Sequence, residues 1–593
     1  MKHSALLTLC ALPLLTLAAC GGVGGADSTS NADLAGLSIS AGTLDPPFSS
    51  DTYTYQVGPQ EMLVHGSVTL TPLAAHAGAT ITVDGLTVAS GTPSSAIDVP
   101  VTVTPVLVRV TAEDGVSVRE YNVILTRQGI SLQTDYVKAS NTDENDFFGS
   151  SVALDGDTLV VVALGESSSA TGVNGNQIDN SASSSGAAYV FVRSGSTWSQ
   201  QAYLKASNTG ANDQFGYSVA LDGDTLVVGA GGEDSIATGV NGNQSDNSAS
   251  SSGAAYVFVR SGDTWSQQAY LKASNADVDD RFGNSIALDG DTLVVGARSE
   301  DSGATGVNGD QFNNSALGSG AAYIFVRSGG TWSQQAYLKA SNSGTIDEFG
   351  WSLDLDGDTL VVGAVYESSN AAGVDGDELN NLALSSGAAY VFFRSGGTWS
   401  QQAYLKASNT DANDRFGSSV AVDGDTLVVG ALLEDSSATG VNGNQTDNSA
   451  LASGGAYVFV RIGSIWYQEA YLKASNTGED DQFGYSVKLH GDTLVVGSHF
   501  EDGGATGVDG SNNNSADFSG AAYVFVRSGS NWSQEDYLKA STADSGDLFG
   551  QSVALDGDTV VVGAIHESSN ATGVGGNDTD NSAPDSGAIY IFK

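Results

Sequence analysis

Length, composition and charge already narrow the possibilities for this chain. At 593 residues it is too long to fold around a single hydrophobic core, so we expect two or more folding units. Its 75 glycines and 9 prolines, beside many Val, Thr, Tyr and Phe residues, are typical of short strands and tight turns. The formal net charge of −46 argues against a nucleic-acid partner and against docking on an anionic membrane surface, because both would be repelled.

Residues 1–20 have the pattern of a lipoprotein signal peptide. Lys2 and His3 precede an apolar run, 5–17, which is short for a membrane span and has the proportions of a signal-peptide core. The run ends in Leu-Ala-Ala-Cys, which resembles the lipobox of bacterial lipoproteins and implies acylation of Cys20. Gly21 follows, without the Asp typical of inner-membrane retention, so we expect a lipid anchor in the cell envelope, at the outer membrane or surface of a Gram-negative bacterium. The alternative is an ordinary signal peptide that contains a chance cysteine.

A small β domain is expected after a flexible tether at 21–32, which is rich in glycine. Residues 33–128 contain runs such as "TYTYQV", "ATITVDG" and "REYNVILTR", whose period-two alternation and Asp-Gly turns indicate an antiparallel sandwich. The stretches "LSISAGTLDPPF", "VDGLTVASG" and "VTAEDGVSVREYNVILTR" resemble the cadherin-like β-sandwich module of bacterial surface proteins. Because nothing in this segment is typical of catalysis, we interpret it as a spacer.

The rest of the chain is a sevenfold repeat. Phe-Gly pairs recur every 66 or 67 residues, at Phe148, Phe215, Phe282, Phe349, Phe416, Phe483 and Phe549. Each unit has four strand-like runs, which in the second unit are 215–221, 225–230, 253–260 and 265–274. Seven units of four strands predict an all-β, seven-bladed β-propeller over 130–593.

The two ends of the array predict closure of the ring. The array begins with "ISLQTDYVKAS", 130–140, a version of the fourth run, and it ends with a third run, "GAIYIFK". The N-terminal strand can therefore complete the seventh blade. The units "FGYSVALDGDTLVVGA" resemble FG-GAP repeats, the family of the integrin α-subunit head and of many bacterial surface proteins. The resemblance implies a propeller used for adhesion or ligand binding and names no ligand.

An Asp-Gly-Asp tripeptide follows the first run of most units, for example at Asp222-Gly223-Asp224, and His490 replaces the first Asp in the sixth unit. Integrin-type propellers place calcium loops at this hairpin, but here the loop is too short. Two carboxylates cannot surround an ion that takes 6–8 oxygens, whereas Asp-Gly between apolar strands is a strong hairpin signal. We interpret these tripeptides as turns.

The long segments between the second and third runs are better candidates for a site, because loops of this length are often functional. Each begins with a glutamate and continues, about eight residues later, into an Asn- and Asp-rich cluster such as "NGNQIDN". The staggered oxygens resemble those that wrap Ca²⁺, but the clusters match no complete calcium signature, and the alternative is a loop held by side-chain-to-backbone bonds. The candidate calcium ligands are Glu166, Asn174, Asn176 and Asp179; Glu233, Asn241, Asn243 and Asp246; Glu300, Asn308, Asp310 and Asn313; Glu367, Asp375, Asp377 and Asn380; and Glu434, Asn442, Asn444 and Asp447.

Other recurrent residues have simpler interpretations. An aspartate lies two residues before each Phe-Gly pair, on the side of the disc where the long loops are expected. It is expected to join the metal site or to cap backbone amides. These aspartates are Asp146, Asp213, Asp280, Asp347, Asp414, Asp481 and Asp547. The tryptophan that starts each fourth run, such as Trp265, is expected to cover a blade edge, with carbohydrate stacking as the alternative. Lys205, Arg260 and their equivalents are expected to protect exposed strand edges.

Three functions remain open. A non-enzymatic surface lipoprotein for adhesion or ligand binding comes first, with a protein or glycan ligand on a surface or matrix, membrane contact only through the lipid anchor, and Ca²⁺ as the one candidate cofactor. A cell-envelope scaffold comes second and a glycan-acting hydrolase third. Near-identical blades argue against an enzyme, because catalysis needs unlike groups at one place, and the chain offers no Ser-His-Asp or Cys-His pairing.

Overall fold

The computed structural model describes residues 28–40, 43–57, 67–95, 97–98, 104–125, 132–510 and 513–593. The signal peptide with Cys20, and tether residues 21–27, lie outside this part of the chain. The chain divides into two compact units, one N-terminal and one containing the repeats. In the described residues the secondary structure is β apart from a 3₁₀ turn, η1 (Ser28–Ser30), and none of their helices is long and apolar enough to cross a membrane.

The N-terminal unit is built from short strands around a small core. Its sheets have the orders β2-β9-β8-β5-β6, β1-β4 and β3-β7. Tyr55, Val108 and Tyr121 are among its fully buried side chains. The strands are β1 (Leu34–Ile39), β2 (Thr54–Val57), β3 (Ser67–Val68), β4 (Leu70–Ala74), β5 (Thr80–Val83), β6 (Leu86–Val88), β7 (Ile97–Asp98), β8 (Thr104–Thr111) and β9 (Val118–Leu125).

Two details of this unit differ from the expectation. β2 pairs with β9 in parallel, so the sandwich is not purely antiparallel, since alternation of side chains carries no information on strand direction. The end of the expected tether also contacts the unit, because Thr29 O accepts a hydrogen bond from Asp114 N at 3.0 Å and Ala32 is buried.

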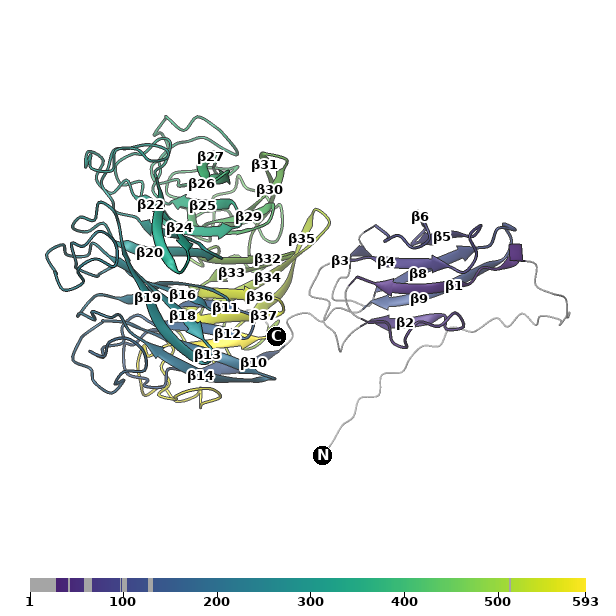
Figure 1. Ribbon diagram of the computed structural model, residues 1–593, viewed down its shortest axis with the longest axis horizontal. Helices are drawn as coiled ribbons and strands as arrows, with labels where there is room; N and C mark the ends of the chain where they lie inside the picture. Colours follow the sequence, from purple (N-terminus) through teal and green to yellow (C-terminus); the bar gives the residue numbers. More distant parts are fainter. Residues whose placement is uncertain are drawn as a thin grey trace. The chain divides into compact units, whose positions relative to one another are not determined.

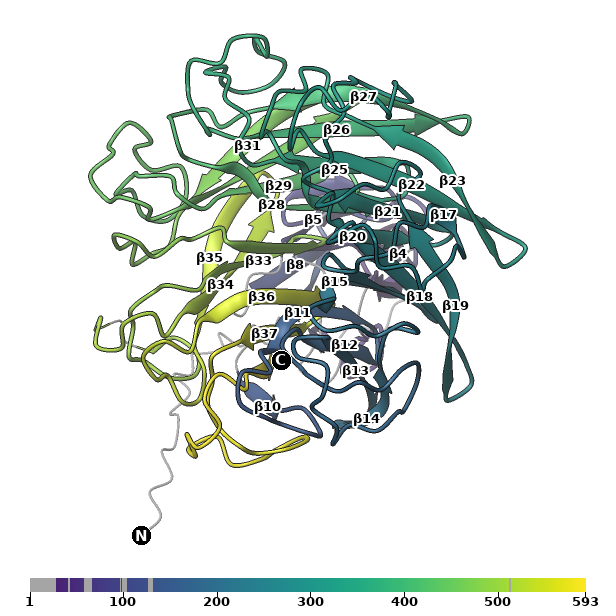
Figure 2. The same cartoon turned by 90° about the vertical axis from the view of Figure 1, so that its left-hand side faces the viewer.

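The larger unit is the predicted seven-bladed propeller (Figures 1 and 2). Blades 1 to 3 are β11 (Phe148–Asp155), β12 (Thr158–Ala163), β13 (Ala187–Ser194), β14 (Thr197–Leu204); β15 (Phe215–Asp222), β16 (Thr225–Ala230), β18 (Ala254–Ser261), β19 (Thr264–Lys272), with the short β17 (Gly239–Val240) beside β19; and β20 (Phe282–Asp289), β21 (Thr292–Ala297), β22 (Ala321–Ser328), β23 (Thr331–Leu338).

Blades 4 to 7 repeat the same order from the centre outward. They are β24 (Phe349–Asp356), β25 (Thr359–Ala364), β26 (Ala388–Ser395), β27 (Thr398–Leu405); β28 (Phe416–Asp423), β29 (Thr426–Ala431), β30 (Gly455–Ile462), β31 (Ile465–Leu472); β32 (Ser486–His490), β33 (Thr493–Ser498), β34 (Ala521–Ser528), β35 (Asn531–Leu538); and β36 (Phe549–Asp556), β37 (Thr559–Ala564), β38 (Ala588–Phe592), β10 (Gln133–Val137).

The ring closes through the N-terminal strand. β10 pairs antiparallel with β38 and forms the outer strand of the seventh blade, while β36 contacts β11 of the first blade. The two ends of the propeller sequence therefore lie in one sheet.

The Phe-Gly pair explains how neighbouring blades pack. Phe215 is fully buried and belongs to a cluster that joins Val160 and Val162 of blade 1 to Tyr256 of blade 2. Gly216 follows with φ +105°, and a Cβ there would lie 2.0 Å from Val162 Cγ1. Glycine is thus required by both backbone conformation and close packing.

Candidate functional site

The propeller has two different faces. Tight turns join the first to the second strand and the third to the fourth strand of each blade, and these turns form the hairpin face. Long loops join the second to the third strand, as at 164–186 in blade 1, and together with the connections between blades they form the loop face.

A buried ion pair anchors the long loop of blade 1. Lys205 Nζ lies 2.7 Å from Glu166 Oε2 and donates to Ser185 Oγ at 2.7 Å, with both charged side chains almost fully buried. Tyr203 Oη donates to Glu166 Oε1 at 2.8 Å, and the Ser168 amide donates to Oε2 at 3.1 Å. The loop is therefore held by a satisfied polar cluster rather than by apolar packing.

The same ion pair recurs in every blade and corrects the expectation for the lysines. We expected them to protect exposed strand edges, but they are fully buried and pair with the loop glutamates, and this burial lowers their pKa values. The pairs are Lys205–Glu166, Lys272–Glu233, Lys339–Glu300, Lys406–Glu367, Lys473–Glu434, Lys539–Glu501 and Lys138–Glu567. The last pair joins the closing segment after β10 to the loop of blade 7.

The Asn and Asp clusters bind backbone amides. Asn174 Oδ1 accepts a hydrogen bond from Tyr203 N at 3.0 Å, Asn176 Oδ1 accepts from Ile178 N at 3.2 Å, and Asp179 Oδ1 accepts from Ser181 N at 3.1 Å. Corresponding bonds to backbone amides are made by Asn241, Asn243, Asn308, Asp310, Asp375, Asp377, Asn380, Asn442 and Asn444.

These contacts favour the interpretation that each loop is held by its own hydrogen bonds, rather than the interpretation that it binds a metal. The glutamates pair with the buried lysines, and in blade 1 Glu166 also accepts from Tyr203, so their charge is balanced away from the Asn and Asp clusters. Asp447 accepts from the Ser437 hydroxyl. The backbone carbonyl of Asn313 accepts a hydrogen bond from Gly303 N. Among the described residues no group of three or more His, Cys, Asp or Glu is arranged to hold a metal. Calcium binding stays a prediction.

The aspartates before the Phe-Gly pairs cap the connections between blades. Asp213 is buried, and its Oδ2 accepts a hydrogen bond from Gly210 N at 2.7 Å. Burial raises the pKa to about 7 for Asp146, Asp213, Asp481 and Asp547, to about 8 for Asp280 and Asp414, and to about 6 for Asp347. These residues carry a pH dependence of stability and lie too deep to contact a large ligand.

On the hairpin face the Asp-Gly-Asp tripeptides are turns, as expected, and they also join blades. Asp155 Oδ2 accepts a hydrogen bond from Gly223 N of the next blade at 2.6 Å. Arg260 Nε lies 2.6 Å from Asp224 Oδ1, and its Nη1 donates to Thr158 Oγ1 of the preceding blade at 2.9 Å. Sequence reasoning missed this role, because a single unit does not contain its partner.

The recurrent tryptophans lie inside this packing. Trp265 Nε1 donates to Gln201 Oε1 of the preceding blade at 2.8 Å, and the Arg260 guanidinium lies 5.2 Å from the Trp265 ring centroid. The rings of Trp198, Trp265, Trp332, Trp399, Trp466 and Trp532 are buried, so they are not available to stack on a carbohydrate.

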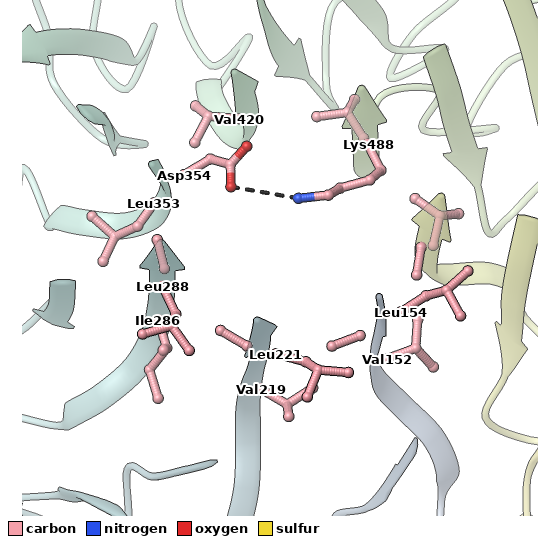
Figure 3. Close-up of a pocket in the computed structure, with 16 residues that line it drawn as sticks. Val152, Leu154, Val219, Leu221, Ile286, Leu288, Leu353, Asp354, Val420 and Lys488 are labelled. Carbon is pink, nitrogen blue, oxygen red and sulfur yellow. Dashed lines mark hydrogen bonds and ion pairs between the residues drawn. The ribbon is translucent and has the colours of Figure 1, made fainter. Parts of the chain in front are cut away.

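The side chains that line the central channel are apolar apart from one ion pair (Figure 3). It has a volume of about 200 Å³ and is lined mainly by Val, Leu, Ile and Ala of the innermost strands. Asp354 of blade 4 and Lys488 of blade 6 replace the alanine that the other blades carry at this position, and Lys488 Nζ lies 3.5 Å from Asp354 Oδ1. Asp354 Oδ2 also accepts from Val422 N at 2.7 Å, so the pair ties blades 4, 5 and 6 together.

At the loop-face end of the channel the blades differ most from one another, and we call this region the mouth. It is formed by the residue before and the residue after each Phe-Gly pair, and by the two residues that follow the second strand of each blade. In blade 6 the ring of His499 lies 3.8 Å from Tyr485 and 4.0 Å from Phe500. Burial lowers the His499 pKa to about 3. Unlike groups therefore converge here, which the near-identity of the blades had argued against.

A second feature of the loop face is a set of exposed apolar loop tips. Phe312 is 73% exposed, Leu379 80% and Leu384 68%. Backbone bonds link the segments that carry them, since Ile346 N donates to Leu317 O at 2.8 Å across blades 3 and 4. We call these residues of blades 3 to 5 the apolar tip patch: Phe312, Leu317, Ile346, Leu379, Leu382, Leu384 and Leu451.

Comparison with known proteins agrees with this architecture. The FG-GAP repeat description matches residues 133–191, 198–258, 265–325, 332–392, 399–459, 466–525 and 532–592, and the cadherin-like beta sandwich domain matches residues 34–128. No curated protein matches the chain. One similar solved structure is a protein from Bacteroides thetaiotaomicron described as a candidate glycoside hydrolase, at 21% identity over 20% of this chain and 31% of that chain. Its TM-score of 0.13 carries no argument. The chain belongs to the FG-GAP repeat family, with a cadherin-like β-sandwich domain before the repeats.

Proposed function

We propose that this protein is a non-enzymatic bacterial surface lipoprotein that uses the loop face of its propeller for adhesion. In this proposal Cys20 carries the lipid anchor at the outer membrane, and the cadherin-like domain is the spacer between anchor and propeller. The observation that carries the proposal is the apolar tip patch, because exposed apolar side chains on the loops of neighbouring blades commonly mark an interaction surface.

The chemistry of the patch indicates the kind of partner. The loops that carry Phe312 and Leu379 also carry Asp310, Asp377 and Glu378, so the apolar side chains lie among carboxylates. A protein ligand with apolar residues flanked by lysine or arginine would complement this surface, whereas an acidic ligand or nucleic acid would be repelled. Each loop is held by its buried ion pair, which limits the ordering cost of binding.

The proposal is tested by binding of the purified protein to immobilised extracellular-matrix and cell-surface proteins. The triple variant Phe312→Ser, Leu379→Ser, Leu384→Ser should lose most binding. Ile178→Ser is the matched control, because Ile178 occupies the same loop position as Phe312 in blade 1 and is 88% exposed without the neighbouring leucines. Equal binding by the wild type and a folded triple variant would contradict adhesion through this patch, and dependence of envelope integrity on the protein would then favour a scaffold.

Calcium dependence is a separate part of the proposal. The oxygens that calcium would use, such as Asn174 Oδ1 and Asn176 Oδ1, already accept backbone hydrogen bonds. Calcium would therefore have to replace these hydrogen bonds or to use the remaining lone pairs of the same oxygens. Binding of the protein ligand, measured with calcium and with chelator, tests this part of the proposal.

A further inference from the structure

One tryptophan differs from the others of the chain. Trp351 follows the Phe-Gly pair of blade 4 and is half-buried at the mouth, whereas the six recurrent tryptophans are buried between blades. The other blades carry unlike residues at its position: Ser150, Tyr217, Asn284, Ser418, Tyr485 and Gln551. Since each of these side chains is compatible with the fold, packing alone does not require the tryptophan.

Three of the five unusual cations of the propeller lie near the same place. Apart from the lysine and the arginine that recur in the blades, residues 132–593 contain Arg281, Arg298, Arg415, Lys488 and Lys593. Arg281 and Arg298 come from blade 3 and Arg415 comes from blade 5. All three act on one carboxylate, because burial raises the pKa of Glu348 and the three arginines oppose that rise. Three arginines therefore surround one half-buried carboxylate in a chain whose net charge is −46.

The polar atoms at the centre of this cluster lack close partners. Arg298 Nε lies 4.0 Å from Glu348 Oε2, which is too far for a hydrogen bond. Both atoms are buried, and neither makes a hydrogen bond with any part of the chain that the structure describes. A buried donor without an acceptor costs about 1–3 kcal/mol, so the chain by itself leaves this cluster unsatisfied.

Aromatic rings flank the arginines. The Arg298 guanidinium lies 4.6 Å from the Trp351 ring centroid and 5.7 Å from that of Tyr217. The Arg415 guanidinium lies 5.1 Å from the Tyr366 ring centroid, and Tyr366 packs edge-on against Trp351. Rings and cations therefore alternate across blades 2 to 5 of the mouth.

We propose that the mouth binds an acidic carbohydrate. The carboxylate of a uronic acid would accept hydrogen bonds from Arg298 and Arg415, and the apolar C–H face of its sugar ring would pack on the exposed parts of Trp351 and Tyr217. The site adjoins the apolar tip patch through the backbone, since Glu348 N donates to Gly318 O at 3.0 Å. It uses different side chains, so the proposal does not depend on adhesion through that patch. A free sugar acid and the end of an acidic polysaccharide share this chemistry.

The test is isothermal titration calorimetry of the full chain with trigalacturonic acid. Its methyl ester is the neutral control, galacturonic acid tests a free sugar acid, and sodium sulfate tests an anion without a sugar. We expect the acid to bind at least about tenfold more tightly than the ester, since a charged hydrogen bond contributes about 1.5–3 kcal/mol. Tighter binding of the trisaccharide than of the monosaccharide indicates a polysaccharide, and equal affinity indicates a free sugar acid.

Variants assign the binding to the mouth. Arg298→Ala and Arg415→Ala should each weaken binding roughly tenfold or more, and Glu348→Gln should strengthen it by removing the competing carboxylate. Arg109→Ala is the control, because it removes one exposed cation from the N-terminal unit. Thermal melting shows which variants fold, and having two arginine variants keeps the test decisive if one does not. No binding of trigalacturonic acid, equal binding of ester or sulfate, or unchanged affinity in both folded arginine variants would overturn the proposal.

Discussion

Replacing Lys205 by Met tests whether the buried ion pairs hold the long loops in place. The change removes the ammonium group whose Nζ lies 2.7 Å from Glu166 Oε2 and keeps a side chain of similar length. Glu166 would keep its bonds from Tyr203 and from the Ser168 amide, but its charge would remain buried without a cation. Removal of one partner of a buried pair costs about 3–5 kcal/mol.

The melting temperature follows from this free energy. Unfolding entropy is about 2.1 cal/mol/K per residue, so a propeller of this length that unfolds as one unit has an entropy on the order of 1 kcal/mol/K. Lys205→Met should therefore lower the melting temperature by about 3–5 °C. The double variant Glu166→Gln, Lys205→Met removes both charges and should recover part of this loss, which makes the coupling measurable in a double-mutant cycle.

Differential scanning calorimetry of the wild type, both single variants and the double variant measures these shifts. Asp157→Asn is the matched control, because Asp157 pairs with Arg193 at the exposed hairpin face and such surface pairs contribute at most about 1 kcal/mol. Two results would refute the reasoning. One is a fall in melting temperature of less than about 1 °C for Lys205→Met. The other is a double variant whose melting temperature falls by the sum of the two single changes, or by more.

Three further predictions concern pH, blade contacts and calcium. The raised pKa of Asp213 means that the fold favours its protonated form, so the stability from this group is complete below pH 4 and is lost as pH rises through about 7. Asp213→Asn should therefore flatten this part of the melting-temperature profile between pH 4 and pH 8. An unchanged slope would contradict the prediction. His490→Asp should raise the melting temperature, because it restores the carboxylate that other blades place beside the next hairpin, with a gain of about 0.5–1.5 kcal/mol. The control His490→Asn shows whether this gain requires the negative charge. If calcium adds to the loop oxygens of Asn174 and its equivalents, it should raise the melting temperature and chelator should lower it; no change in either would remove the calcium prediction.

The propeller was predictable because its strands are fixed by local chemistry. The second unit predicts strands at 215–221 and 225–230, and the structure has β15 at Phe215–Asp222 and β16 at Thr225–Ala230. Asp-Gly turns and apolar runs of this kind need no knowledge of distant residues. β17 was missed because a two-residue strand, Gly239–Val240, has no periodicity to detect.

The site was less predictable because its contacts join residues far apart in the chain. Lys205 directly follows a strand, which in sequence is indistinguishable from an exposed edge lysine. Its burial depends on a loop glutamate that lies 39 residues earlier and folds back over it. The mouth was missed for a different reason. The repeat is recognised by the residues that the blades share, whereas the mouth is formed by residues at which the blades differ. Trp351 and Arg298 were visible as departures from the repeat.

These departures allow a test in which the protein supplies its own control. Blade 2 carries Gly231, Gln214 and Tyr217 where the mouth has Arg298, Glu348 and Trp351. The backbone is the same at one of these positions, with φ 56° at Gln214 and 54° at Glu348, and blade 2 forms the same four strands. The triple variant Arg298→Gly, Glu348→Gln, Trp351→Tyr should therefore keep its melting temperature within about 2 °C, because it loses one long ion pair and the weak ring contacts of Arg298 and Trp351. The same variant should lose binding of trigalacturonic acid, because it lacks the guanidinium and the indole. A large loss of stability would instead assign these residues to the fold, and their variation among the blades would then need another explanation.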